Sequence, residues 1–370
     1  MTETANASVS TRLAGRVREA IAEAGGWLGF DHFMEMALYE PGLGYYAAGA
    51  RQFGHLPASG SDFVTAPELS PLFGRALARQ VAQALAASGT DEVFEFGAGS
   101  GALAQQLLES LGGAVKRYTV IDLSGALRER QRERLAPFGA RVRWVDAWPT
   151  AMQGVVVGNE VLDAMPVQLL HFDGAAWQER GLAAGAGGGF VFADRPTALH
   201  PPVEADFPAG YVTEIHSQAR AFVTSLAERL ERGAVFFVDY GFPEAEYWHP
   251  QRSGGTLMCH RAHRVDANPL IDVGEKDITA HVDFTGIALA GQDAGLEVLG
   301  YTSQARFLLN CGLLELLKDA DIRRIGNAQK LLNEHEMGEL FKVIAFAKGC
   351  ESSFIAAPIG FVRGDRTHTL

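Results

Sequence analysis

The feature that most constrains the fold is the glycine-rich run Glu95-Phe-Gly-Ala-Gly-Ser-Gly101. It follows the apolar segment EVFEF at 92–96 and opens a predicted helix over 102–111. Glycines allow the backbone to turn sharply and to approach a ligand, and the first N–H groups of a helix then face that ligand. A strand, a glycine turn and a helix in this order are typical of the first unit of a doubly wound sheet.

Short apolar segments alternate with helical ones beyond this turn. The predicted strands cover 92–96, 117–123, 141–147, 154–160 and 234–241, and the predicted helices between the first of them cover 102–111 and 126–135. Such alternation favours an α/β fold, a Rossmann-like and mostly parallel sheet with helices on both faces. A chain of 370 residues has room for this core and for added elements.

Two regions lie outside this alternation. Helical patterns over 9–24, 31–38 and 70–87 predict an N-terminal helical extension. About 70 residues separate the fourth and fifth strands, far more than one crossover needs, and they predict a β-containing insertion that ends in a helix over 214–232. The expected parts are 1–90 (extension), 91–160 (first part of the core), 161–232 (insertion) and 233–370 (second part of the core). In the last part we expect a helix over 285–294, a strand over 297–303, two helices to about 348 and a final strand over 354–362.

Charge and cysteine usage exclude several classes of protein. Lys and Arg number 32 against 44 Asp and Glu, a net charge of −12, so a nucleic-acid partner is not expected. No apolar run approaches the ~18 residues of a membrane span, and the N-terminus lacks a signal or transit pattern. Cys259, Cys311 and Cys350 are isolated from one another, which predicts neither disulfides nor a metal site. We therefore expect a cytoplasmic protein.

Two classes of cofactor use a glycine turn of this kind. A dinucleotide site needs G-x-G-x-x-G/A, which Gly97, Gly99 and Ala102 satisfy. An S-adenosyl-L-methionine (SAM) site has an acid before G-x-G-x-G, and Glu95 with Gly97, Gly99 and Gly101 satisfies that pattern more fully. A carboxylate at the strand end repels a pyrophosphate but favours a sulfonium and an ammonium group. SAM is therefore favoured over a nicotinamide cofactor, and over a turn without a ligand.

Acids also end the next two predicted strands. Asp122 follows the second strand, where its carboxylate could accept hydrogen bonds from ribose hydroxyls. Asp146 follows the third, and with Ala147 and Trp148 it could bind and cover an adenine ring. Three acids at the ends of three successive strands support SAM more strongly than the glycines alone.

The fourth strand ends in polar residues that suit the methyl acceptor. In open α/β sheets the reacting groups gather at the carboxyl ends of the strands. Asn159, Glu160 and Asp163 are therefore the candidate catalytic residues. The alternative is that Glu160 caps a following helix and that Asp163 points to solvent.

Six segments resemble the MidA-type family of SAM-dependent methyltransferases. They are YEPGLGYY (39–46), DFVTAPELSPLFG (62–74), FEFGAGSGALA (94–104), GNEVLDAMPV (158–167), DYGF (239–242) and DITAHVDFT (277–285). The resemblance implies a class I methyltransferase core, SAM as donor and a protein side chain as acceptor. Mitochondrial members are complex I assembly factors that methylate a protein arginine, so a complex I subunit is the partner it implies.

The resemblance also implies roles for individual residues. Gly97, Gly99, Gly101 and Asp122 would hold SAM, Asn159 and Glu160 would face the acceptor, and Thr65, Pro67 and Glu68 would form part of the site's entrance. Met258, after Gly255-Thr-Leu257, departs from the family pattern, in which a basic residue is expected at this position. His260 and His263 are expected to be surface residues and not metal ligands. His281 and Asp283 are expected to form a packed polar pair, and a role in a site or an interface is the alternative.

The sequence thus predicts a SAM-dependent methyltransferase that modifies a protein arginine. A guanidinium is a poor nucleophile, because it is protonated and its lone pairs are delocalised. A carboxylate such as Glu160 could bind two of its N–H groups and aim the third nitrogen at the methyl. A SAM-binding assembly scaffold without turnover and an NAD(P)-dependent oxidoreductase remain the alternatives.

Overall fold

The computed structural model describes residues 8–48, 65–122, 125–261, 264–318 and 321–370. Its centre is an eight-stranded sheet in the order β15-β16-β10-β5-β2-β3-β4, with β14 paired to β10. Only β16 runs antiparallel to its two neighbours within this path. The bounds are β2 Glu92–Phe96, β3 Arg117–Ile121, β4 Val142–Val145, β5 Met152–Asn159, β10 Leu230–Phe242, β14 Val282–Asp283, β15 Glu297–Ser303 and β16 Phe341–Lys348. This is the expected class I methyltransferase fold.

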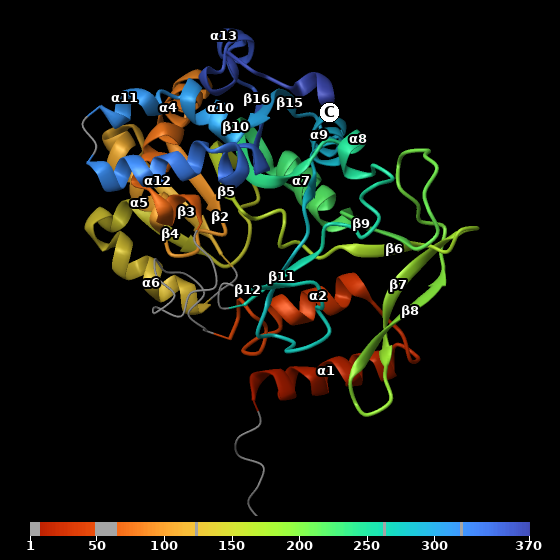
Figure 1. The fold of residues 1–370 in the computed structure, drawn as a ribbon. Helices are drawn as coiled ribbons and strands as arrows, with labels where there is room; N and C mark the ends of the chain where they lie inside the picture. Colours follow the sequence, from red (N-terminus) through yellow and green to blue (C-terminus); the bar gives the residue numbers. More distant parts are fainter. Residues whose placement is uncertain (1–7, 49–64, 123–124, 262–263, 319–320) are drawn as a thin grey trace, which may run out of the picture.

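Helices cover both faces of this sheet because its strands are apolar on both sides (Figure 1). Along β10, Val235 and Phe237 pack against one set of helices, while Ala234 and Phe236 pack against the other. The first set is α7 (Ser217–Arg229) and α9 (Phe284–Asp293). The second set is α4 Pro71–Ser88, α5 Ala102–Leu111, α10 Gln304–Asn310, α11 Leu313–Leu317, α12 Ile322–Leu332 and α13 Ser352–Ala356. Helix α6 (Gly125–Leu135) follows β3.

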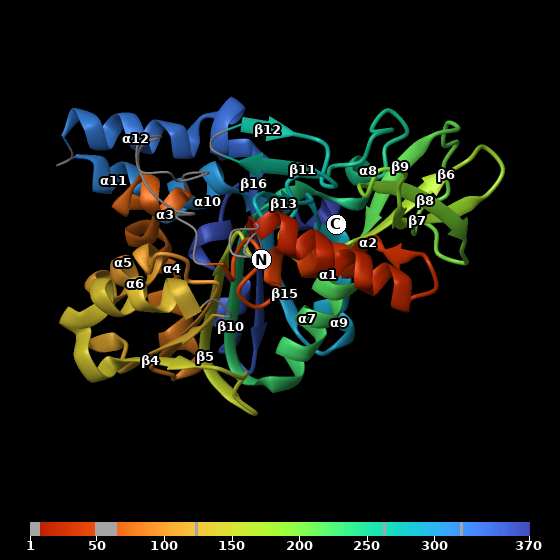
Figure 2. The same cartoon turned by 90° about the horizontal axis from the view of Figure 1, so that it is seen from below.

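A second lobe lies beside the sheet (Figure 2). It contains an antiparallel sheet in the order β1-β7-β6-β9, with β8 paired to β7, and a small sheet β12-β11-β13. Helices α1 (Val9–Glu23) and α2 (Phe30–Tyr39) share its hydrophobic core. The strands are β1 Leu28–Gly29, β6 Gln168–Phe172, β7 Trp177–Ala184, β8 Phe190–Pro196, β9 Tyr211–Ile215, β11 Met258–Arg261, β12 Arg264–Asp266 and β13 Asp277–Thr279.

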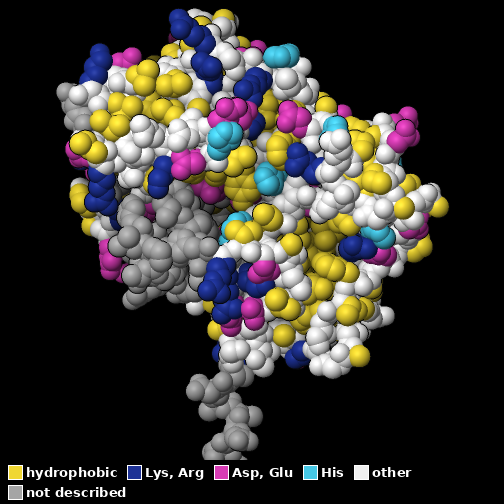
Figure 3. All heavy atoms as spheres, in the orientation of Figure 1, with side chains coloured by type: hydrophobic (Ala, Val, Ile, Leu, Met, Phe, Trp, Pro, Cys, Tyr) yellow, Lys and Arg dark blue, Asp and Glu magenta, His cyan; other side chains and the backbone are white. Residues whose placement is uncertain are grey.

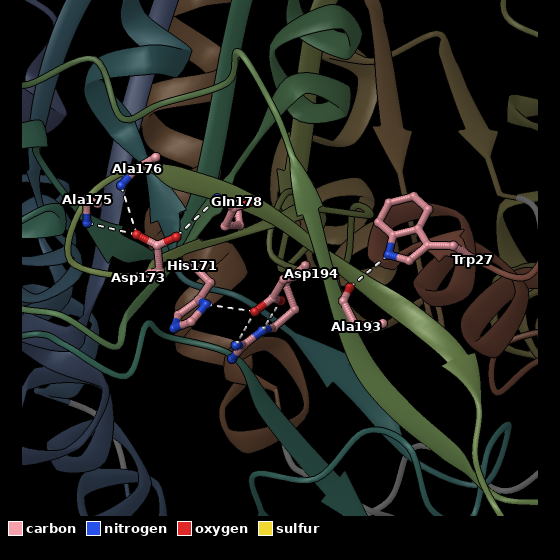
Figure 4. A network of polar contacts seen from close by, with 9 residues as sticks. Trp27, His171, Asp173, Ala175, Ala176, Gln178, Ala193 and Asp194 are labelled. Carbon is pink, nitrogen blue, oxygen red and sulfur yellow. Dashed lines mark hydrogen bonds and ion pairs between the residues drawn. The ribbon is translucent and has the colours of Figure 1, made fainter.

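Polar contacts join neighbouring strands of this lobe and connect the lobe to the N-terminal segment (Figure 4). Asp194 on β8 binds Arg180 of β7 through two nitrogens, at 2.8 and 2.9 Å, and contacts His171 of β6 at 2.7 Å. The Trp27 indole donates to the Ala193 carbonyl at 2.8 Å. The insertion therefore folds together with the first helices of the chain, and we call this unit the accessory lobe (residues 9–48, 167–215 and 256–280).

Packing divides the predicted N-terminal extension in two. Helices α1 and α2 belong to the accessory lobe, whereas α4 packs on the central sheet. The short helix α3 (Ala66–Leu69) connects to α4. Because both halves are amphipathic helices, periodicity could not distinguish their partners.

Three predicted elements are wrong in type or extent. The helix over 214–232 is shorter, because β9 extends to Ile215 and Leu230 begins β10. The segment 341–348, predicted as helix, is strand β16, which lies buried between β10 and β15. The final strand over 354–362 is instead helix α13 and a 3-10 turn at Ile359–Phe361, where Phe354 and Phe361 fill the core beside α4 and α10. An apolar run buried on all sides has no periodicity that separates helix from strand.

No helix in the described ranges is long and apolar enough to cross a membrane.

Candidate active site

A cavity of about 1130 Å³ lies at the carboxyl ends of β2, β3, β4 and β5, where the accessory lobe meets the sheet. Its core side includes Gly97, Asp122 and Glu160, and its accessory side includes Tyr46 and Asp277. In the view of Figure 3, acidic and histidine side chains lie beside apolar ones near the middle of this face. The cavity is large enough for a drug-sized ligand together with a second group.

The glycine turn has a backbone that other residues adopt only with strain. The φ angles of Gly97, Gly99 and Gly101 are 62°, 53° and 80°. A Cβ on Gly97 would also lie 3.1 Å from a methyl of Val161. Gly97 and Gly99 line the cavity, whereas Gly101 is the N-cap of α5 and faces Gln131 and Leu135. The role of Gly101 is therefore to shape the turn.

The acid at the end of β3 is tied to this turn. The buried side chain of Gln131 donates from Nε2 to Asp122 Oδ2 at 2.7 Å and to the Gly99 carbonyl at 3.0 Å. Asp122 lines the cavity beside the glycines. One amide thus fixes the distance between the predicted ribose acceptor and the predicted cofactor turn.

Glu95 lies below the turn, almost fully buried. It accepts a hydrogen bond from the Tyr118 hydroxyl at 2.7 Å. Burial raises the pKa of Glu95 to about 8, despite this hydrogen bond. Glu95 therefore favours its protonated form at neutral pH, and a cation nearby would favour its ionised form.

The third acid, Asp146, stands at the solvent edge of the cavity. Its side chain is 87% exposed and pairs with Arg128 at 2.5 Å. Ala147 and Trp148 line the cavity with it, and the Trp148 ring packs on Phe96 and Phe222 at 4.7 and 4.9 Å between centroids. Phe222 on α7 extends this aromatic surface, and the sequence analysis missed it because α7 lies 70 residues further along the chain.

The end of β5 carries the predicted acceptor residues. Glu160 has a left-handed backbone (φ 54°), and Asn159 Nδ2 donates to Glu160 Oε1 at 2.9 Å. Both line the cavity with Asp163. No helix follows Glu160, and Asp163 is only 4% exposed, so the alternatives of a helix cap and a solvent-facing carboxylate are both wrong. Burial, and then the charge of Asp163, raise the pKa of Glu160 to about 8.

The predicted entrance is partly wrong. Thr65 and Pro67 line the cavity, but Glu68 is buried beneath the glycine turn. There it accepts hydrogen bonds from Ser100 and from Arg134, the latter at 2.7 Å. A carboxylate at the start of α3 is buried here because Arg134 of α6 neutralises it, a contact that the sequence does not reveal.

The accessory lobe and the segment directly after it contribute residues to which the sequence analysis gave no firm role. Tyr39 and Tyr46 line the cavity with stacked rings 5.6 Å apart, while Tyr45 is buried in the lobe core. Asp277, Thr279 and His281 line it from the segment that the family resemblance had marked. Asp283 does not pair with His281 but caps α9 by accepting from Gly286 N–H. Met258 and His260 also line the cavity, and His263 lies outside the described residues.

Comparisons with known proteins decide the family. Residues 76–302 match the family model described as "Putative S-adenosyl-L-methionine-dependent methyltransferase". The chain belongs to this family. This methyltransferase is also similar to a solved structure of a likely methyl transferase from Burkholderia thailandensis bound to S-adenosyl-homocysteine. That structure is 53% identical, covers 98% of this chain and 97% of its own, and has a TM-score of 0.93.

More distant relatives carry a more specific name. A zebrafish (Danio rerio) protein named "Protein arginine methyltransferase NDUFAF7, mitochondrial" is 26% identical over 91% of this chain and 86% of its own. Its human counterpart is 25% identical over 85% of this chain and 78% of its own. These similarities support the MidA-type family that the sequence motifs indicated.

The described residues of the methyltransferase fit SAM. The glycine turn lines the cavity with a positive-φ backbone, Asp122 offers a carboxylate beside it, and Trp148 with Phe222 offers an apolar surface for a ring. A carboxyl at Glu95, at the strand end, suits a positively charged ligand, which favours its ionised form. SAM is thus the cofactor, and the nicotinamide alternative is wrong.

Proposed function

We propose that this methyltransferase transfers the methyl group of SAM to an arginine side chain of a protein. The observation that carries the proposal is the acidic lining of the cavity around Glu160. Among the described lining residues the only Lys or Arg is Arg229, whose guanidinium lies 5.3 Å from the Trp148 ring centroid. The acidic lining residues are Glu35, Glu95, Asp122, Asp146, Glu160, Asp163 and Asp277. A cavity with low-dielectric walls and mostly acidic side chains favours a positively charged acceptor.

Glu160 would bind the guanidinium. Its Oε1 accepts from Asn159, which fixes the carboxylate, and its position at the end of β5 places it in the cavity that also contains the glycine turn. A guanidinium offers paired N–H donors that match a carboxylate. An arriving cation would lower the pKa of Glu160, so that the carboxyl releases a proton and forms an ion pair as the acceptor binds.

The chemistry of the bound cofactor is an electrophilic methyl group on a positively charged sulfur. The chain's own contribution is orientation, which can be worth roughly 7–11 kcal/mol when reacting atoms are held in line. Glu160 and Asn159 hold the acceptor nitrogen, and the two stacked tyrosines from the accessory lobe form part of the cavity wall beside them. The low local dielectric of a partly buried cavity strengthens the ion pair that orients the acceptor.

The relatives' name, protein arginine methyltransferase, supports the same acceptor. By family resemblance we propose a respiratory complex I subunit as the substrate, and a cytoplasmic location for the enzyme. An assembly scaffold that binds SAM without turnover is the competing function.

The test is to incubate the purified enzyme and methyl-labelled SAM with an extract of source cells that lack the gene. Acid hydrolysis and amino-acid analysis then identify the labelled residue. Label in methylarginine is the expected result. Label in another amino acid overturns the arginine proposal, and absence of protein label with SAM bound supports the scaffold.

A further inference from the structure

The turn that carries Glu160 and Asp163 is built around a third carboxylate. Asp239, at the carboxyl end of β10, is 1% exposed, and its Oδ2 accepts the N–H groups of Val161, Leu162 and Asp163 at 3.1, 2.8 and 3.3 Å. Three hydrogen bonds to one oxygen fix the backbone of the turn. This explains how Glu160 keeps its left-handed conformation and how both acidic side chains reach the cavity.

The two oxygens of Asp163 have different surroundings. Oδ2 accepts a hydrogen bond from the Tyr240 hydroxyl. Oδ1 is buried and has no hydrogen-bond partner among the described residues. A buried carboxylate oxygen without a donor is costly, and Asp163 lines the cavity, so a donor that enters the cavity would relieve this cost.

Two further polar atoms in the same part of the cavity lack a partner within the described ranges. They are Thr279 Oγ1 and His281 Nδ1, on a segment joined to the turn by the hydrogen bond from Ala280 N–H to the Asp163 carbonyl at 3.0 Å. The His281 ring packs against Tyr240 at 5.1 Å. Polar groups from the core and from the accessory lobe thus converge beside Asp163.

We propose that Asp163 accepts the proton that the arginine nitrogen loses on methylation, and that Tyr240 is the positioning residue that fixes its carboxylate. The proposal rests on the proposed function and extends it. As the new N–C bond forms, the C–S bond breaks and its electron pair stays on sulfur, which becomes neutral. The surplus proton of the nitrogen passes to Asp163 Oδ1. Glu160 keeps its contacts with the other N–H groups, so the two carboxylates have separate roles.

The charged and titratable groups around Asp163 suit a proton acceptor. They come from the same turn, from β10, from the accessory segment and from the N-terminal tyrosines: Glu160, Asp239, Tyr240, Asp277, His281, Tyr39 and Tyr46. Burial raises the pKa of Asp163 to about 6, and the hydrogen bond from Tyr240 opposes this rise. Burial also lowers the pKa of His281 to about 4, so the ring is neutral and does not repel an incoming cation.

The test measures the initial rate of methylarginine formation from pH 5 to 9 with the same extract and saturating SAM. In the wild type the rate should rise with pH as Asp163 ionises. The rate of Asp163→Asn at pH 8 should be about 10²-fold lower, which is the lower end for general acid–base catalysis. The rise of the rate with pH, the acid limb of the profile, should disappear in this variant. Tyr240→Phe should move the midpoint of the limb to higher pH, because the hydrogen bond that lowers the pKa of Asp163 is removed.

Tyr211→Phe is the matched control. It also removes a buried tyrosine hydroxyl, but one that lies outside the cavity lining and donates to the His249 carbonyl at 3.3 Å, so its midpoint should stay. An Asp163→Asn rate within twofold of wild type overturns the proton-acceptor role. A Tyr240→Phe variant that is slower with an unchanged midpoint overturns the positioning role. Label outside arginine is distinct from both results, because it overturns the proposed function itself.

Discussion

The Tyr46 hydroxyl donates a hydrogen bond to Asp277 Oδ1 at 2.8 Å, although 231 positions separate the two residues. Tyr46 follows helix α2, and Asp277 begins β13, so the contact joins two parts of the accessory lobe at the cavity. It also holds the Tyr46 ring in its stack on Tyr39. The accessory side of the cavity thus depends on a contact within the accessory lobe.

Tyr46→Phe should therefore affect the acceptor more than the cofactor. The ring stays but its hydrogen bond is lost, which leaves a buried carboxylate short of one donor and costs roughly 1–3 kcal/mol. We expect a higher KM for the protein acceptor and an unchanged Kd for SAM by calorimetry. A parallel loss of SAM affinity would mean that this contact shapes the whole cavity.

Substitutions at the glycine turn should act on the cofactor. Gly97→Ala forces a positive φ on alanine and pushes against Val161, and Asp122→Ala removes the carboxylate held by Gln131. Both should weaken SAM binding, Asp122→Ala by roughly 1–3 kcal/mol. The control is Gly89→Ala, which also has a positive φ (60°) but caps α4 in open space. It should lower stability and leave the Kd for SAM unchanged, and equal SAM affinity in all three variants would contradict our assignment of the turn.

Glu160→Gln should separate binding from turnover. The substitution keeps the size of the side chain and removes the charge that pairs with a guanidinium. SAM affinity should change little, whereas methyl transfer should fall by about 10²-fold, or roughly 2.7 kcal/mol of transition-state stabilisation. The exposed Glu109→Gln on α5 is the control and should keep full activity. Parallel loss of SAM binding in Glu160→Gln would place Glu160 in the cofactor site, and full retention of both would remove it from the site.

The stability of the SAM-free protein should fall as pH rises. The pKa of Glu95 is about 8 in the folded protein against an ordinary value of 4.5, so between these values the unfolded chain releases a proton that the folded protein keeps. Unfolding is favoured increasingly from about pH 4.5 to 8, and the loss is complete above pH 8. The pKa of Glu160 is also raised to about 8, so Glu160 likewise lowers the stability of the folded protein as pH rises.

Thermal unfolding of wild type and Glu95→Gln from pH 5 to 9 checks this expectation. Because Gln does not ionise, the Tm of the variant relative to wild type should rise across this range. A constant difference in Tm would show that Glu95 is ionised in the folded protein throughout.

The sequence by itself determined the core and the cofactor. Alternating apolar strands and helices could bury their surface only in a layered α/β sheet, and a glycine turn behind an acid could suit only a limited set of ligands. Gly97, Gly99 and Asp122 could be predicted to share one site in this way, and they line one cavity, because their positions depend on local order along the chain. The strand β16 was predicted as helix because a fully buried apolar run shows no alternation of apolar and polar residues that would identify a strand.

Only the tertiary structure decided which side chains share the cavity. Tyr46 meets Asp277 because the segment with β13 packs with helix α2 in the core of the accessory lobe. Asp163 meets Tyr240 because β10 lies beside β5. Glu68 was predicted to lie at the entrance, but it is buried because it forms an ion pair with Arg134 of α6. Contacts of this kind join residues that lie far apart in the sequence. They form only when the elements pack in three dimensions, so the spacing of residues along the chain does not predict them.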